Sequence, residues 1–170
     1  MPAATVPAHW RGMLTMVGVL LVADQAAKWV VRAKLELGES VEVIPGFLDF
    51  TRVHNSGAAF GLLNGIDLPY KAAILAVVAL AALVGVAAYA STLPEPEWLS
   101  RLALTCIVGG AAGNLVDRVT LGYVVDYVDA YWRGWHFWAF NVADAAITIG
   151  AALMILDILG LGKRDASRTV

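Results

Sequence analysis

Two aspartates, Asp126 and Asp144, stand apart from the other ionisable residues because neither has a basic residue three or four positions away. If the fold brings them together away from water, two like charges cannot both form easily, and one carboxyl group keeps its proton. Such a pair suits hydrolysis, because the ionised member can take a proton from water while the protonated member polarises the scissile carbonyl. A purely structural role is the alternative for both residues.

A second set of polar residues follows helical spacing. Asn114, Asp117 and Arg118 are three and four positions apart, so they share one face of a helix. Asp24 and Lys28 are four positions apart with the acid first, which is the favourable order for pairing. A charge at the centre of a bilayer costs about 2.5–3.5 kcal/mol, so each of these charges is expected to have a compensating partner or a function. The spacing predicts internal pairs of Asp24 with Lys28 and of Asp117 with Arg118, although a role in chemistry stays open.

Asparagines accompany these charges. Asn141 precedes Asp144 by three positions, so these two residues also share a helix face. Asn114 and Asn141 could form hydrogen bonds between helices within the membrane. Asp129, by contrast, is expected to be a solvated residue.

The composition indicates which elements must position these residues. Hydrophobic residues make up 59% of the 170-residue chain and charged residues only 15%, whereas soluble domains have about 25% charged residues. We therefore predict one integral membrane domain over residues 1–170, an all-α bundle of four transmembrane helices. The segments with the roughly 20 mostly apolar residues that a spanning helix needs are residues 12–32, 70–90, 98–119 and 138–161.

The connecting segments carry further signals. In the long loop over about residues 33–69, Ser40–Ile44 and Phe47–His54 alternate apolar and polar residues around a Pro-Gly pair, which predicts a β-hairpin. The loop over residues 120–137 is rich in Tyr and Trp and suits a belt at the level of the lipid headgroups. A short helix on the membrane surface is predicted from the spacing of Leu62, Leu63, Ile66 and Leu68.

The helix count predicts where the polar residues meet. With four spans both termini lie on one side, the third span runs outward and the fourth returns. The end of the third span and the start of the fourth then share one membrane face with Asp126, and the long loop with His54 and Asn55 opens on the same side. The basic C-terminal tail indicates cytoplasmic termini, although the count of Lys and Arg by itself does not favour this orientation.

Other classes of site and function are weaker. No His, Cys and carboxylate cluster has the spacing of zinc ligands, so we expect no metal and no cofactor. The net charge of −2 gives no basic surface for nucleic acid. A proton-coupled transporter remains open, but the chain is small and has no internal repeat. A serine peptidase using Ser56 with Lys28 or His54 also remains open, although Ser56 fits a turn residue better.

Five motifs, in order along the chain, resemble those of lipoprotein signal peptidase, or signal peptidase II, a family of bacterial membrane aspartyl proteases. Any one motif alone is weak, but together they cover nearly the whole chain. They are Asp24-Gln25-x-x-Lys28, Asn55-Ser56-Gly57-Ala58-Ala59-Phe60-Gly61, Gly113-Asn114-x-x-Asp117-Arg118, Gly122-Tyr123-Val124-Val125-Asp126 and Phe140-Asn141-x-Ala143-Asp144.

The resemblance implies specific roles. Asp126 and Asp144 match the catalytic aspartates of the family, and Lys28 and Gly57 lie within its motifs. Tyr127 and Trp138, in and after the third loop, depart from the residues common in the family, which are Phe and Pro. The other functional positions around the active site are matched by Asp24, Asn55, Asn114, Arg118 and Asn141.

The resemblance also implies partners and location. Family members remove the signal peptide from prolipoproteins just before a diacylglyceryl-modified cysteine, and antibiotics of the globomycin type inhibit them. The outer loop of the family forms a β-cradle and a surface helix over the site. We therefore expect a monomer in the bacterial inner membrane, in contact with lipid, with both termini cytoplasmic and the active site near the outer face.

Overall fold

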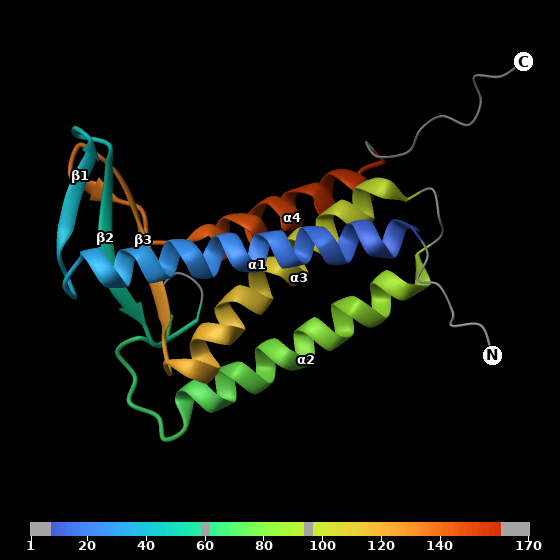
Figure 1. Ribbon diagram of the computed structural model, residues 1–170, viewed down its shortest axis with the longest axis horizontal. Helices are drawn as coiled ribbons and strands as arrows, with labels where there is room; N and C mark the ends of the chain where they lie inside the picture. Colours follow the sequence, from blue (N-terminus) through green and yellow to red (C-terminus); the bar gives the residue numbers. More distant parts are fainter. Residues whose placement is uncertain (1–7, 59–61, 94–96, 161–170) are drawn as a thin grey trace, which may run out of the picture.

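Four helices and a small sheet make up the part of the chain that the computed structural model describes, residues 8–58, 62–93 and 97–160. The helices lie lengthwise beside one another, and the sheet covers one end of the bundle (Figure 1). The first turn of α1 and the last turn of α4 lie at the opposite end. The helices are α1 (Ala8–Lys34), α2 (Lys71–Thr92), α3 (Trp98–Thr120) and α4 (Val142–Ile158).

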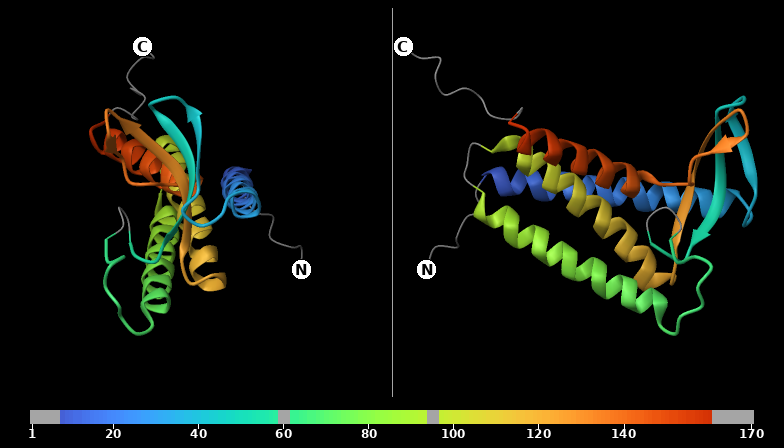
Figure 2. Two further views of the ribbon diagram at one scale, coloured as in Figure 1. Left: turned by 90° about the vertical axis from the view of Figure 1, so that its left-hand side faces the viewer. Right: turned by 180° about the vertical axis from the view of Figure 1, so that it is seen from behind.

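The central helix is α3, which packs against α1, α2 and α4. Figure 2 shows α2 diverging from α1 and α4 toward the sheet, where the end of α3 lies beside it. Close packing depends on glycines of α3, as the small-residue pattern of the sequence indicates. A Cβ atom on Gly113 would lie 2.6 Å from Asp24 Oδ2, and one on Gly110 would collide with the carbonyl oxygen of Ala143.

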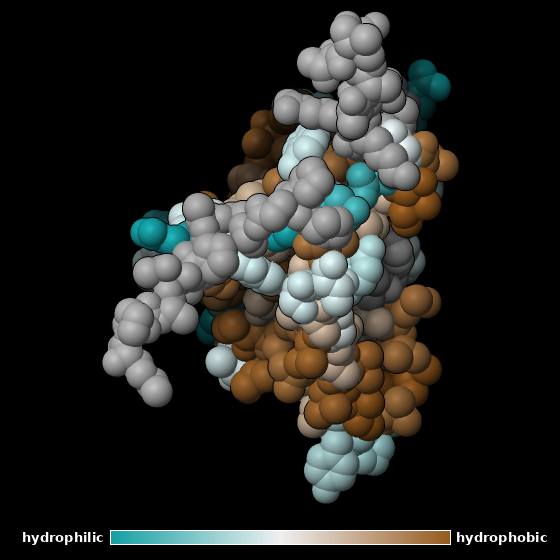
Figure 3. Space-filling view, turned by 90° about the vertical axis from the view of Figure 1, so that its right-hand side faces the viewer, coloured by the Kyte–Doolittle hydropathy of each residue, from teal (hydrophilic) through white to brown (hydrophobic). Residues whose placement is uncertain are grey.

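Three helices are long and apolar enough to cross a membrane: Trp10–Lys34 within α1, α2 and α3. None of the most apolar 18-residue window of α2 is buried inside the protein, which fits a helix that faces lipid. Apolar side chains cover the lower part of the surface in Figure 3, where α2 lies.

The fourth helix is shorter than predicted. We expected it from Trp138 to Leu161, but α4 has 17 residues and begins at Val142. Its start is set by Asn141, which caps the helix, and by Phe140, which bridges to Val128 of the sheet. At 1.5 Å per residue α4 measures about 25 Å, against about 30 Å of hydrocarbon. The predicted end at Leu161 lies outside the described residues.

The sheet contains four antiparallel strands in the order β1-β2-β3-β4. The first two, β1 (Ser40–Ile44) and β2 (Leu48–Asn55), confirm the predicted hairpin. The segment predicted as an aromatic loop instead contains β3 (Val124–Trp132) and the two-residue β4 (Trp135–His136). Strand β3 pairs with β2, so the sheet joins the two outer segments of the chain.

The predicted surface helix is wrong for the described residues. Residues 62–65 form turns and residues 66–68 have no regular structure. Leu63 has a φ of 70°, in the left-handed region, which interrupts a right-handed helix. Pro69 also disfavours the helical conformation for the residue before it.

Candidate functional site

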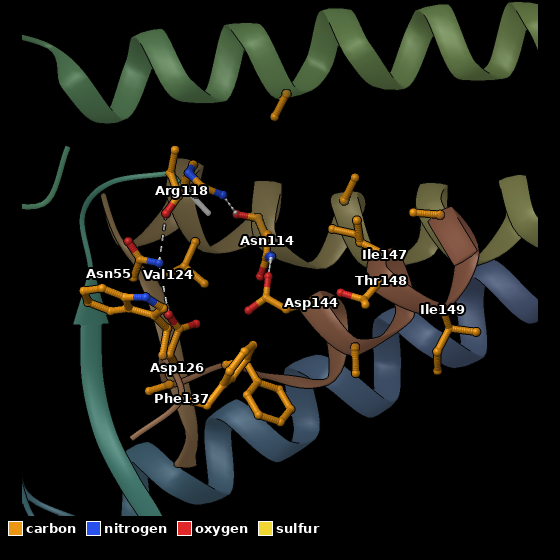
Figure 4. A pocket seen from close by; sticks show the side chains of 18 residues that line it. Asn55, Asn114, Arg118, Val124, Asp126, Phe137, Asp144, Ile147, Thr148 and Ile149 are labelled. Atoms are coloured by element: carbon orange, nitrogen blue, oxygen red, sulfur yellow. Dashed lines mark hydrogen bonds between the residues drawn. The ribbon is translucent and has the colours of Figure 1, made fainter. Parts of the chain in front are cut away.

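The predicted polar residues gather where the bundle meets the sheet. Figure 4 shows Asp126, Asp144, Asn55, Asn114 and Arg118 around one cavity. The cavity has a volume of about 680 Å³, and its other walls are mostly apolar side chains from α2, α3, α4 and the segment before α4. Two carboxyl groups thus share a largely apolar space with one guanidinium group and two amides.

Asn141 connects the two aspartates. Its Oδ1 accepts a hydrogen bond from the backbone N–H of Asp144 at 2.9 Å, and its Nδ2 donates to Asp126 Oδ1 at 2.7 Å. Asp144 Oδ2 in turn accepts from the backbone N–H of Asn141 at 3.3 Å, which completes a capping box. Asn141 is fully buried. The start of α4 therefore fixes one aspartate and binds the other.

Each aspartate also accepts a hydrogen bond from a second amide. Asn114 Nδ2 donates to Asp144 Oδ1 at 2.7 Å, and Asn55 Nδ2 donates to Asp126 Oδ2 at 3.0 Å. Burial raises the pKa of Asp126 to about 7, and the charge of Asp144 acts in the same direction, against the two amide hydrogen bonds and Lys28. An aspartate with this pKa can gain or lose a proton near neutral pH.

An ion cluster lies behind the amides. Lys28 Nζ contacts Asp24 at 2.8 Å, Asp117 at 3.0 Å and Asn114 Oδ1 at 2.9 Å. The predicted Asp24–Lys28 pair is confirmed. The prediction for Asp117 is wrong, because Asp117 forms its ion pair with Lys28 on α1 rather than with Arg118 on its own helix. Gln25 Nε2 also donates to Asp117, at 2.9 Å.

The cluster holds the elements that carry the aspartates. Asp24 Oδ1 accepts from the backbone N–H of Ala143 at 3.0 Å, in the first turn of α4. Asp117 Oδ2 accepts from the backbone N–H of Val125 at 3.0 Å, next to Asp126 on β3. The two carboxylates therefore satisfy N–H groups at the start of α4 and on β3, where they fix the backbone beside each candidate aspartate.

Arg118 fixes the loop after β2. Its Nη2 donates to the carbonyl oxygen of Gly57 at 3.0 Å, and its Nη1 donates to that of Asn114 at 3.4 Å. A Cβ atom on Gly57 would collide with the Leu62 carbonyl oxygen and lie 2.9 Å from the Asn64 backbone nitrogen. Glycine is therefore required where the loop folds back on itself.

Ser56 lies beside Lys71, not in the pairing considered for a serine peptidase. Lys71 Nζ donates to Ser56 Oγ at 3.2 Å and also to the carbonyl oxygens of Leu63 at 3.1 Å and Ile66 at 2.9 Å. An ammonium group that donates three hydrogen bonds has no free lone pair to act as a base. His54 stacks on the ring of Tyr123, with 3.7 Å between centroids.

Asp129 is also more ordered than expected. It lies in β3 and contacts His136 Nδ1 at 2.9 Å, with a side chain that is only 18% exposed. Both residues line a second cavity of about 390 Å³ on the sheet side, which Asp126 also borders. The sequence held one signal for this region, the β-branched and aromatic residues around Asp126 that favour a strand.

Within residues 8–58, 62–93 and 97–160, no group of three or more His, Cys, Asp or Glu side chains could hold a metal ion. The site itself presents two carboxyl groups, their amide donors and one guanidinium group.

Known proteins resemble this chain in sequence. Residues 16–160 match the family model described as signal peptidase (SPase) II. A lipoprotein signal peptidase of Geobacter metallireducens is 41% identical over 158 residues, covering 93% of this chain and 96% of that protein. Another, of Symbiobacterium thermophilum, is 42% identical over 150 residues, covering 88% and 95%.

Solved structures of bacterial membrane enzymes also resemble this protein in fold. A bacterial membrane enzyme determined by the in meso method at 2.3 Å resolution superposes with a TM-score of 0.80 at 29% identity, covering 94% of each chain. A second, at 1.9 Å resolution, gives 0.78 at 30% identity, covering 87% of this chain and 92% of that one. With a family model that spans most of its length and relatives of this similarity, the chain belongs to the signal peptidase II family, whose members are membrane proteases.

Proposed function

We propose that this protein is a membrane aspartyl endopeptidase that removes the signal peptide from diacylglyceryl-modified prolipoproteins, just before the lipidated cysteine. The observation that carries the proposal is the pair of hydrogen bonds through which Asn141 holds both Asp126 and Asp144 at one cavity. The relatives named lipoprotein signal peptidase support the substrate class.

The proposed chemistry is general acid–base hydrolysis. One carboxylate takes a proton from water as the water oxygen attacks the scissile carbonyl carbon, and the other carboxyl group donates a proton to the carbonyl oxygen. The raised pKa of Asp126 supports a pair that shares one proton near neutral pH. Arg118 and Asn55, at the cavity wall, are proposed to orient the substrate peptide.

The cavity supports a lipid-anchored substrate. Its walls include Ala79 of α2 and Ile147 and Ala151 of α4, and an apolar wall between helices suits a signal peptide and acyl chains that arrive within the bilayer. Anchoring the substrate there would hold the scissile bond at the depth of the aspartates, which converts a three-dimensional search into a local one. Globomycin-type inhibitors are proposed to bind in the same cavity.

The proposed topology has four spans, with both termini in the cytoplasm and the sheet at the outer face. The first turn of α1 and the last turn of α4 lie at the end of the bundle away from the sheet, which supports this arrangement (Figure 1). The short α4 would complete its span with the flanking residues at each end. We propose that the protein acts as a monomer in the inner membrane.

The test is cleavage of a lipidated prolipoprotein by the purified protein, followed by a gel shift. Asp126→Asn and Asp144→Asn should each abolish cleavage, because asparagine can neither take the proton of water nor supply an acidic one. The matched control is Asp67→Asn, which changes an exposed aspartate in the outer segment and should leave activity unchanged. Substantial cleavage by a folded Asp144→Asn or Asp126→Asn protein would refute the aspartyl mechanism.

A further inference from the structure

The amides around Asp126 have fixed orientations. The Oδ1 atoms of Asn55 and Asn141 accept from backbone N–H groups, those of Gly57 at 3.0 Å and Asp144 at 2.9 Å. A backbone N–H can only donate, so neither amide can exchange its oxygen and nitrogen. Both Nδ2 groups must therefore point at Asp126, one at each of its oxygens, at 3.0 Å and 2.7 Å.

The surroundings of Asp144 are different. Lys28 Nζ donates to Asn114 Oδ1 at 2.9 Å, so Asn114 Nδ2 must face Asp144 Oδ1, at 2.7 Å. The hydrogen bond recorded at Asp144 Oδ2 is the long one of 3.3 Å from the backbone N–H of Asn141. Two strong donors favour the ionised form of Asp126, whereas Asp144 Oδ2 is the carboxyl oxygen of the pair with the weakest donor.

The two aspartates also differ in the cavities that they border. Asp126 borders both the cavity between the helices and the cavity on the sheet side, whereas Asp144 borders only the first. The second cavity has polar groups of Thr51, Asn64 and His136 in its lining, beside apolar side chains that include Val53 and Phe137. Asp126 therefore faces a second, partly polar space that Asp144 does not border.

We infer that the roles of the two aspartates are divided by these amides: Asp126 is the ionised base that activates water, and Asp144 carries the acidic proton on Oδ2. This assignment rests on the proposed function. As the water oxygen bonds to the scissile carbonyl carbon, Asp126 takes one water proton and Asp144 gives its proton to the carbonyl oxygen. When the C–N bond breaks, Asp126 gives its proton to the leaving amine and Asp144 takes one from the tetrahedral hydroxyl, which restores the starting state.

The first test is thermal stability, which needs no substrate. In Asp126→Asn the new NH₂ group must face either Asn55 Nδ2 or Asn141 Nδ2, donor against donor. Asp144→Asn keeps the hydrogen bond from Asn114 through its oxygen, and its NH₂ group loses only the long hydrogen bond of 3.3 Å from the backbone N–H of Asn141. The Tm of Asp126→Asn should therefore be lower than that of Asp144→Asn by about 3–6 °C. Equal values, or the reverse order, would overturn the assignment.

A double variant that exchanges the Asn and Asp side chains at positions 55 and 126 tests the same hydrogen bond if Asp126→Asn folds poorly. Asn55→Asp combined with Asp126→Asn returns an acceptor to the new NH₂ group, and its Tm should exceed that of Asp126→Asn alone. Asn55→Asp combined with Asp144→Asn has no new NH₂ group next to residue 55, so its Tm should not exceed that of Asp144→Asn alone. A swapped variant that is no more stable than Asp126→Asn, or that also fails to fold, would count against the orientation of Asn55.

The second test is the pH profile of kcat/KM for a lipidated precursor, which reports the free enzyme. Asn55→Ser removes one donor from the proposed base and should move the acidic limb upward by about one pH unit. The charged groups around the pair, Lys28, Asp24, Asp117 and Arg118, and Asp129 with His136 across the second cavity, are unchanged in this variant. Movement of the basic limb instead would assign the proton to Asp126. If the wild-type protein cleaves no precursor, the proposed function fails, while the order of Tm values still tests the hydrogen bonds.

Discussion

Asn141 Nδ2 donates to Asp126 Oδ1 at 2.7 Å, so the residue that caps α4 also binds the carboxylate on β3. One side chain thus serves helix stability and the candidate active site. These two roles can be separated by substitution.

We predict that Asn141→Ser keeps most of the stability and loses most of the activity. Serine also caps helices, but its short hydroxyl cannot satisfy Asp144 N–H and reach Asp126 together. Asn141→Ala should lose the cap as well, at a further cost of about 1 kcal/mol. Thermal melts and the gel-shift assay would measure both effects. An Asn141→Ser protein that cleaves at the wild-type rate would show that the contact with Asp126 is dispensable.

The stability of the protein should depend on pH through Asp126. Its pKa is raised from 3.8 to about 7 in the folded protein, so between these values the folded state binds more protons than the unfolded state. The contribution of this group is therefore fully present below pH 4, declines as the pH rises, and is lost above about pH 7, for a total of about 2–4 kcal/mol. The fall in Tm between pH 5 and pH 8 should be smaller in Asp126→Asn than in the wild type. An identical fall in both proteins would contradict the raised pKa.

The ion cluster predicts unequal effects of its members. Lys28→Met leaves Asp24 and Asp117 buried without their shared cation and should cost about 3–5 kcal/mol of stability. Asp117→Asn leaves the Asp24–Lys28 pair in place and should cost less. A thermal melt of each variant would rank them. If Lys28→Met were more stable than Asp117→Asn, Lys28 would not be the residue that stabilises the cluster.

Lys71 is predicted to position the outer segment over the cavity. Lys71→Met removes hydrogen bonds to Ser56, Leu63 and Ile66, so it should raise KM for a lipidated precursor about fivefold while changing kcat less than about twofold. Lys34→Met, at an exposed lysine at the end of α1, is the matched control. Equal KM values for the two variants would show that the segment does not depend on this lysine.

Hydropathy and motif spacing predicted most of the fold. The helical segments follow from runs of apolar residues, and the spacing of Asn114 and Arg118 agrees with their place at one cavity. The start of α4 was misplaced because hydropathy continues through Phe140, whereas the actual boundary is set by a side-chain cap. The third loop was misread because the same aromatic residues suit both a membrane interface and a strand.

The sequence did not predict which residues of different helices and strands would be in contact. Arg118 is adjacent to Asp117 in the chain, yet Asp117 pairs with Lys28 because α1 crosses α3 at that point. Likewise, the approach of Asn55 to Asp126 depends on the pairing of β2 with β3, which joins residues 71 positions apart. Local periodicity contains no information on such contacts, whereas the family motifs indicated the residues without their geometry.

The central position of α3 has a consequence for biosynthesis. Helices α1 and α2 are made first, but the main interfaces between helices in the described part of the chain all involve α3 or α4. Strand β2 is likewise synthesised before its partner β3, and Lys28 is synthesised before its partners Asn114 and Asp117. The nascent chain would therefore leave the ribosome with Lys28 paired only to Asp24 of its own helix and without its partners on α3. Assembly of the site becomes a late event, completed only when the last helix has been released into the membrane.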